Sequence, residues 1–178
     1  MKLTLDMLKE KRACEPGIEL YKQHGCPDTV DTTVALCMQE GEYEYANWLL
    51  CNVAFDTRQR RLYVINAAEL ALPIFEAAYP DDTRPRDAIV AAKKYAEGEI
   101  TIEQLHDAAH ATRAIAYALA DAVYACAAAN VAYAAYAACA VDTAHHAAAV
   151  YVVDAAYYAA DAIGWGKIID FGLTLIKG

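Results

Sequence analysis

The stretch DDTRPRDAIVAAKKYAEG, residues 81–98, decides the fold class, because it carries helix signals from its first residue to its last. Asp82 or Thr83 opens the helix as an N-cap, and Pro85 falls in the first turn, where no backbone N–H has a helical partner. Two lysines come late, where a positive charge complements the helix dipole, and Gly98 supplies the stop. The stretch therefore predicts one complete helix.

Two further helix starts flank this stretch and use the same chemistry. Downstream, Thr101 is followed three residues later by Gln104, the spacing of a capping box. Upstream, Asp56 and Gln59 have the same spacing and begin a helix that runs toward a kink at Pro73. Helices are therefore expected on both sides of the opening stretch.

The first part of the chain divides into shorter helices. A helix over residues 3–14 is expected to stop at Pro16-Gly17. Asp28 or Thr29 caps a second helix, which Gly41 ends. Residues 43–55 are rich in Trp, Leu and Val and predict a buried helix.

An alanine-rich tract without glycine or proline runs from residue 99 to residue 163. Alanine is the best intrinsic helix former, but one helix of this length could not bury its apolar side, so we expect it to fold back at Asn130 and at Asp142-Thr143. No run of β alternation occurs. We predict an all-α bundle in which short N-terminal helices (1–98) pack with long alanine- and tyrosine-rich helices (99–178) as one continuous domain.

Composition narrows the functional classes. The chain has 178 residues and a formal net charge of -9, which argues against general nucleic-acid binding, because phosphates attract cationic surfaces. Residues 122–141 carry no charge, but alanine contributes almost nothing to membrane insertion, so no membrane span is expected. The charged N-terminal segment does not resemble a signal peptide. We therefore expect a cytoplasmic protein whose six cysteines are reduced and mostly buried.

Polar residues return through the alanine-rich tract at helical spacing, in one stripe between residues 106 and 124 and in another between residues 151 and 161. Leu105, Ile115, Leu119 and Cys126 fall opposite the first stripe. The stripes are either solvated or partner-facing surfaces, or they face each other and enclose a groove with tyrosine walls. In both interpretations the predicted binding residues are Tyr117, Asp121, Tyr124, Tyr151, Asp154, Tyr158 and Asp161.

A metal site is the weaker interpretation of the histidines. His106 and His110 are four residues apart and could ligate one ion from one helix face, with Asp142, His145 or His146 completing the set. The intervening residues lack the glutamate of a zinc-protease helix, and no P-loop or nucleophile motif occurs in the chain. We therefore predict no metal, no cofactor and no enzyme.

The arginines of the middle third suggest an anion site. Arg84 and Arg86 lie at a predicted helix start, where free backbone N–H groups favour a phosphate or carboxylate, and Arg113 lies on the first polar stripe. The alternative is local pairing of Arg84 and Arg86 with nearby acidic side chains, which would be Glu76, Asp81, Asp82 or Asp87.

The segments YANWLL (45–50) and AELALPIFEAAYPDDTRPRDAIVAAKKYAEGE (68–99), together with the alanine-rich tail, resemble a group of phage and bacterial immunity proteins. The resemblance covers roughly residues 1–100 by motif and the rest by composition, and YPDDTRPRDAI (79–89) is its most specific part. It implies a non-enzymatic helical protein of a phage or mobile element that neutralises a toxin or a host antiviral defence component. It assigns no site residues.

Three hypotheses follow. The first is a binding protein that presents its acidic, tyrosine-rich helical face to a basic patch on a protein partner. The second is a protein that sequesters a nucleotide signal, with the base stacked on tyrosine and the phosphate on Arg84, Arg86 or Arg113. The third is a structural homo-oligomer that assembles through its alanine faces.

Overall fold

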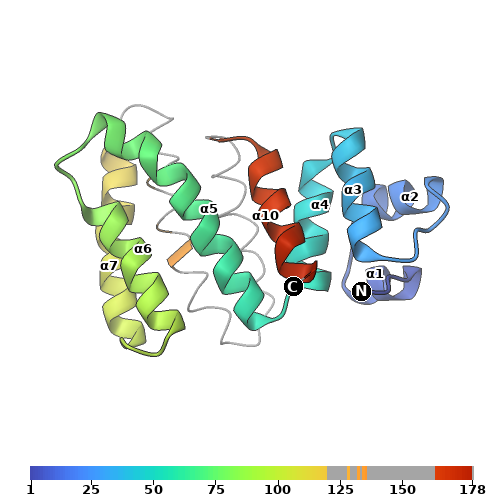
Figure 1. Cartoon of the computed structure of the whole chain (residues 1–178), viewed down its shortest axis with the longest axis horizontal. Helices are drawn as coiled ribbons and strands as arrows, with labels where there is room; N and C mark the ends of the chain where they lie inside the picture. The colour runs from blue at the N-terminus through green and yellow to red at the C-terminus, as the bar shows by residue number, and fades with distance from the viewer. Residues whose placement is uncertain (120–127, 129–131, 133, 136–162, 178) are drawn as a thin grey trace. The chain divides into compact units, whose positions relative to one another are not determined.

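The computed structural model describes residues 1–119, 128, 132, 134, 135 and 163–177, and every regular element in this part of the chain is a helix (Figure 1). One isolated β-bridge joins Lys2 to Thr29. The predicted all-α class is confirmed.

The contacts divide the chain into two compact units. The first contains Met1–Phe55 together with Ile169–Gly178, and the second contains Asp56–Ile168. The predicted boundary between residues 98 and 99 therefore falls inside the second unit. Both chain ends belong to the first unit, so the second unit is inserted into it in sequence.

The first unit begins with α1 (Leu5–Glu10) and α2 (Glu15–Gln23). The predicted stop at Pro16 is wrong, because Pro16 lies in the first turn of α2. A proline there loses no helical hydrogen bond. The first helix ends earlier, in a turn where Arg12 takes a left-handed φ of 60°.

Helix α3 (Val30–Glu40) has the ends that the sequence predicts. The Thr29 hydroxyl accepts a hydrogen bond from the Thr32 amide at 3.3 Å, and Gly41 ends the helix with a φ of 78°. The hydrogen bond from Thr29 lowers the pKa of Asp31, and the chain's N-terminal amine and Lys177 contribute to the same shift. Both chain ends therefore lie near the start of α3 (Figure 1).

The predicted helix over residues 43–55 has two parts. It is α-helical as α4 (Tyr43–Leu49) and continues as the π-helix η1 (Leu50–Ala54), closed by a 2.9 Å hydrogen bond from the Phe55 amide to the Leu50 carbonyl. The side chains of Leu50, Cys51 and Phe55 are all buried. A wider turn in this position is compatible with these core positions, and the sequence pattern alone does not reveal it.

The second unit contains α5 (Thr57–Ala78), α6 (Arg84–Ala96) and α7 (Ile102–Ala118), which lie side by side in Figure 1. Both predicted capping boxes are present, with Asp56 and Gln59 at the start of α5 and Thr101 and Gln104 at the start of α7. The last described helix is α10 (Trp165–Lys177), whose residues from Ile169 onward belong to the first unit.

Buried alanines occur on each of α5, α6 and α7. The fully or almost fully buried ones are Ala67, Ala68 and Ala71 on α5, Ala88 and Ala92 on α6, and Ala109 on α7. Large side chains close one end of this core, where Phe75 and Ile115 pack with Ala128. α7 ends at Ala118, and Leu119, in extended conformation, packs against the same cluster. The predicted break at Asn130 lies outside the described residues.

Within the described residues, no helix is long and apolar enough to cross a membrane. Most of residues 122–141, the uncharged stretch noted above, lies outside that part of the chain. The four cysteines that the structure describes differ in environment, since Cys37 and Cys51 are buried while Cys14 and Cys26 are exposed.

Two glycines provide a matched test of the first unit. A Cβ atom at Gly17, in α2, would meet Cys14 Sγ at 3.4 Å and Tyr45 Cδ1 at 3.7 Å, which are acceptable contacts, so Gly17→Ala should stabilise the protein by about 0.5 kcal/mol. Gly41 has a φ of 78°, so Gly41→Ala should cost about 1 kcal/mol. Urea unfolding measures both free energies. Equal effects of the two substitutions would contradict the backbone geometry described here.

Candidate functional site

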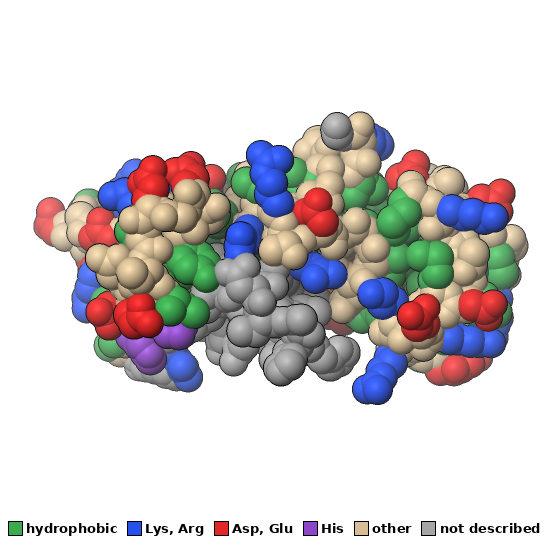
Figure 2. All heavy atoms as spheres, turned by 90° about the horizontal axis from the view of Figure 1, so that it is seen from below, with side chains coloured by type: hydrophobic (Ala, Val, Ile, Leu, Met, Phe, Trp, Pro, Cys, Tyr) green, Lys and Arg blue, Asp and Glu red, His purple; other side chains and the backbone are tan. Residues whose placement is uncertain are grey.

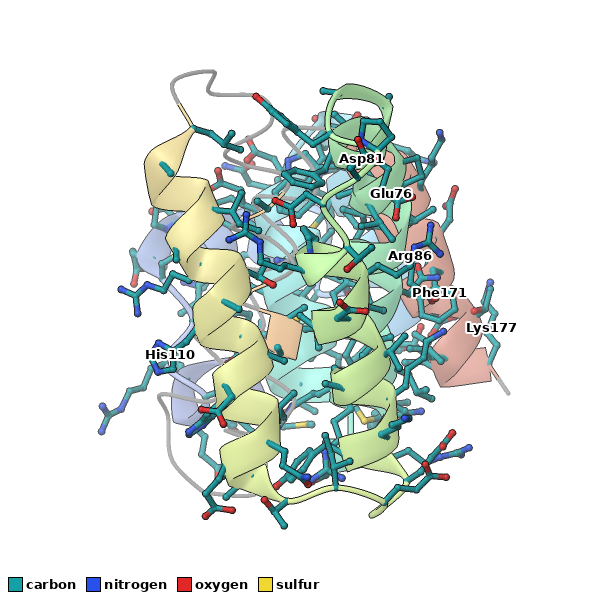
Figure 3. All side chains as sticks on the ribbon, turned by 90° about the vertical axis from the view of Figure 1, so that its left-hand side faces the viewer. Glu76, Asp81, Arg86, His110, Phe171 and Lys177 are labelled. Atoms are coloured by element: carbon teal, nitrogen blue, oxygen red, sulfur yellow. The ribbon has the colours of Figure 1, made fainter. Side chains whose placement is uncertain are left out.

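The described part of the first polar stripe lies on α7. His110 and Arg113 are exposed and His106 is half-buried, while Leu105 and Ile115 on the opposite side are buried. Figure 3 shows His110 on the side of α7 that faces away from α6. The amphipathic pattern predicted for this helix is confirmed over the described residues.

Most of the predicted binding residues lie outside the described part of the chain. Tyr117 belongs to α7, but its side chain is not described. The remaining predicted binding residues that lie outside the described residues are Asp121, Tyr124, Tyr151, Asp154, Tyr158 and Asp161. The predicted meeting of the two stripes also concerns residues outside this part, as does the predicted fold-back at Asp142-Thr143.

The histidines of α7 do not gather with other metal-binding side chains in the part of the chain that the structure describes. No group of three His, Cys, Asp or Glu side chains there could hold a metal ion. His106 instead lies near Glu103, whose pKa is lowered first by a hydrogen bond from Thr101 and to a smaller extent by His106.

Two of the three arginines predicted to bind phosphate, Arg84 and Arg86, each hold a carboxylate of the chain. Arg84 donates from Nε and Nη2 to the two oxygens of Asp82, at 2.8 and 2.6 Å. Arg86 reaches back to α5 and donates to both oxygens of Glu76, at 2.7 Å each. This is the local pairing that the sequence offered as the alternative, and an added phosphate would have to displace a two-point contact.

The turn between α5 and α6 forms an open hollow on the surface of the second unit. It is lined by Ala78, Tyr79, Pro80, Asp81, Asp82, Thr83 and Arg84, and we call this segment the α5–α6 corner. Tyr79 is 36% exposed, and its ring centroid lies 5.2 Å from that of the buried Phe75 ring. Figure 3 shows Asp81, Glu76 and Arg86 following one another along the same side of the molecule.

A buried threonine of α7 is hydrogen-bonded to this corner. Thr112 of α7 is fully buried, and its hydroxyl lies 3.0 Å from the Arg84 carbonyl and 3.1 Å from the Ala108 carbonyl. The contact ties α7 to the first residue of α6. Sequence reasoning missed it, although a polar residue on the buried side of an amphipathic helix is the signal that could have revealed it.

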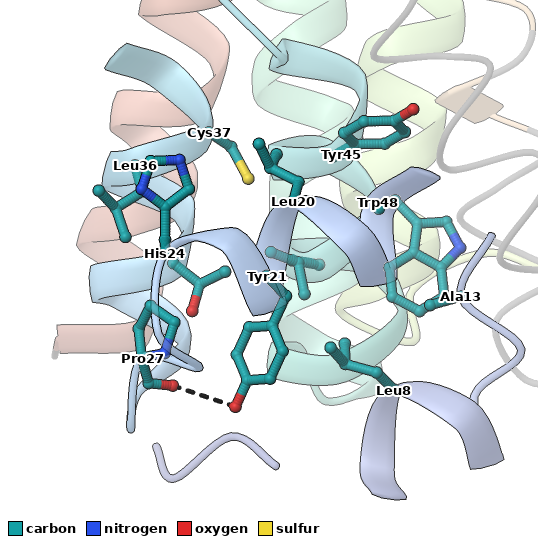
Figure 4. Close-up of a pocket in the computed structure, with 13 residues that line it drawn as sticks. Leu8, Ala13, Leu20, Tyr21, His24, Pro27, Leu36, Cys37, Tyr45 and Trp48 are labelled. Carbon is teal, nitrogen blue, oxygen red and sulfur yellow. Dashed lines mark hydrogen bonds between the residues drawn. The ribbon is translucent and has the colours of Figure 1, made fainter. Parts of the chain in front are cut away.

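The first unit contains a small apolar cavity between α1, α2, α3 and α4 (Figure 4). Its volume is about 30 Å³, far below the ~300–1,000 Å³ of pockets that hold drug-sized ligands. Two polar groups that line it are poorly suited to bind a charged ligand. The Tyr21 hydroxyl donates a hydrogen bond to the Pro27 carbonyl at 3.3 Å, and burial raises the pKa of the Cys37 thiol to about 11. The cavity therefore offers no site for a nucleotide.

Charges of both signs are mixed over the surface that Figure 2 shows, with no large area of one sign. The helix pair α5–α6 illustrates this mixing. Lys93 donates to Glu69 at 2.6 Å, and the Arg61 guanidinium lies 5.7 Å from the centre of the Tyr95 ring.

The comparisons with known proteins relate to the second unit. A family described as "Imm-5 like putative immunity protein" matches residues 55–168, which are almost the same residues as those of the second unit. No curated protein and no solved structure matches the chain.

The ion pair of the α5–α6 corner predicts a pH dependence of stability. The hydrogen bond from Arg84 holds the pKa of Asp82 below its ordinary value of 3.8. A carboxylate with a lowered folded pKa stabilises the protein above its unfolded pKa, and this contribution disappears as the pH falls through the folded pKa. Asp82→Asn should therefore cost up to about 1 kcal/mol at pH 7, because the pair is partly exposed, and almost nothing near pH 2.

Urea unfolding of the wild type and Asp82→Asn between pH 2 and pH 7 measures this difference. Asp81→Asn is the control, since within the described residues the Asp81 carboxylate has no ion pair, and its difference from wild type should not follow the same curve. A constant cost of Asp82→Asn across the pH range would contradict the ion pair.

Proposed function

The chain belongs to the Imm-5-like family of immunity proteins, and on this premise we propose that it is a non-enzymatic protein that binds and neutralises a protein partner. The partner is a toxin or a host antiviral defence component. The single observation that carries this proposal is the family match over residues 55–168. It spans a compact unit with its own buried core, which is what an independent binding module requires.

We further propose that the acidic, tyrosine-rich face of the alanine-rich tract makes the contact. Its residues are Tyr117, Asp121, Tyr124, Tyr151, Asp154, Tyr158 and Asp161. Two facts support this choice. The sequence has no lysine or arginine from residue 114 to residue 166, and α7 is amphipathic as far as it is described, with the stripe on its exposed side. Tyrosine gives a large contact area at low entropic cost, and aspartate attracts a basic partner.

The first step of the test identifies the partner. Native mass spectrometry of the protein, purified gently from the cells that make it, should show a complex with a second protein. A bound small molecule of nucleotide mass, together with a rise in melting temperature when that nucleotide is added, would instead favour the sequestering alternative.

The second step tests the face. With the partner in hand, Asp121→Asn, Asp154→Asn and Asp161→Asn combined should raise the Kd at least about tenfold and reduce its dependence on salt, because steering charges are removed. Isothermal titration at two salt concentrations measures both effects.

A matched variant controls for the change in net charge. Glu10→Gln, Glu19→Gln and Glu44→Gln remove three exposed carboxylates of the first unit and should leave the Kd nearly unchanged. If the two triple variants bind alike, the acidic face is not the binding surface, although the family assignment would stand.

A further inference from the structure

The α5–α6 corner displays an aromatic ring that the fold holds in place. Tyr79 is 36% exposed, while the Phe75 ring beneath it is fully buried, and the two ring planes are inclined by 31°. Ala77, Ala78 and Pro80 are exposed beside it. An aromatic side chain that already packs against a buried ring has less freedom to lose when it binds a partner.

The charges around this ring are unbalanced. Between Glu76 and Asp87 the sequence has four carboxylates and two guanidiniums, which leaves a net charge of -2. Both guanidiniums are engaged, Arg84 with Asp82 and Arg86 with Glu76. Within the described residues no cation pairs with the exposed carboxylate of Asp81.

The backbone of the corner is held at several points. The Tyr79 amide donates to the Phe75 carbonyl at 3.0 Å, and the Asp82 amide donates to the Tyr79 carbonyl at 3.2 Å. The Asp82 carboxylate accepts from the Arg84 amide at 3.2 Å, and Thr112 holds the Arg84 carbonyl from the side of α7. The hollow is therefore a formed surface and does not need to rearrange before it binds.

We propose that the α5–α6 corner is a docking site for an arginine side chain on a loop of a protein partner. The guanidinium stacks on the exposed Tyr79 ring and pairs with the Asp81 carboxylate, while the apolar part of the loop covers Ala78 and Pro80. The identity of that partner as the neutralised protein rests on the proposed function; the docking chemistry does not.

The second unit already contains both kinds of contact that this proposal requires, a guanidinium over an aromatic ring and a guanidinium paired with a carboxylate. The Arg61 guanidinium lies 5.7 Å from the centre of the Tyr95 ring, and Arg84 and Arg86 each make a two-point contact with a carboxylate. A planar guanidinium makes both contacts at once, whereas a lysine ammonium is compact and strongly hydrated. Arginine is therefore the preferred occupant.

An anion is the competing occupant, and the geometry opposes it. The corner's own arginines would have to release Asp82 and Glu76, which would add two unpaired carboxylates next to the incoming charge. The corner therefore favours a cation.

The test uses the full chain and needs no identified partner. The peptides acetyl-Arg-Gly-Arg-amide and acetyl-Lys-Gly-Lys-amide, and inorganic phosphate, are titrated separately into ¹⁵N-labelled protein. We expect the arginine peptide to shift the amide signals of residues 79–84 saturably, and the lysine peptide to bind more weakly. Phosphate should leave these signals in place.

Four variants identify the contacts. Tyr79→Leu and Asp81→Asn should each raise the Kd of the arginine peptide about threefold or more, because each removes one half of the recognition. Tyr79→Phe keeps the ring and should bind like the wild type. Asp107→Asn removes an exposed carboxylate of α7 outside the hollow and should also bind like the wild type. Unchanged signals elsewhere in each spectrum verify that the variants are folded.

Three results would overturn the proposal: no movement of the corner signals with the arginine peptide, an unchanged Kd in both Tyr79→Leu and Asp81→Asn, or shifts caused by phosphate together with a change in the Arg84 Nε signal. The outcome is independent of the partner experiments on Asp121, Asp154 and Asp161. Failure of one proposal is therefore distinguishable from failure of the other.

Discussion

The buried alanines of α5, α6 and α7 are the constraint on which the second unit depends. Ala68, Ala88 and Ala109 have no exposed area, and the other buried alanines of these helices have almost none. A side chain that ends at Cβ allows helices to approach toward the short end of the usual range of about 8–10 Å between axes. It also buries little apolar area, so the remaining stabilisation must come from a few large side chains such as Tyr63 and Phe75, which are fully buried.

This close packing places the charged side chains of α5 and α6 at the surface of the second unit. Helices in close contact leave no room between them for long polar side chains, and the pairs Lys93–Glu69 and Arg86–Glu76 accordingly join α5 to α6 on the outside. Partly exposed pairs of this kind contribute little stability each. At the α5–α6 corner, Arg84 and Arg86 are engaged in such pairs, and within the described residues no cation pairs with the exposed Asp81 carboxylate.

The sequence predicts the helix starts well and their continuation poorly. Capping boxes at Asp56 and Thr101 are confirmed because each is decided by hydrogen bonds within four residues. A proline at position 16 is compatible both with the end of one helix and with the first turn of the next. The first helix ends in a turn where Arg12 is left-handed, and nothing in the sequence predicts this conformation. α7 ends beside Leu119, which packs against a cluster that contains Phe75, a residue distant in sequence. The sequence also does not decide which carboxylate Arg84 binds, because Asp81, Asp82 and Asp87 all lie within three residues of it.

The coincidence of the family match with one compact unit bears on where recognition takes place. The match covers residues 55–168, and the first unit is built from segments on either side of it. The second unit has its own core, including Phe75, Leu105 and Ile115, so its surface does not depend on the first unit for its local shape. The first unit has a separate core and a cavity of only about 30 Å³. A binding function shared across the family should therefore reside on the second unit, where the α5–α6 corner and the alanine-rich tract both lie.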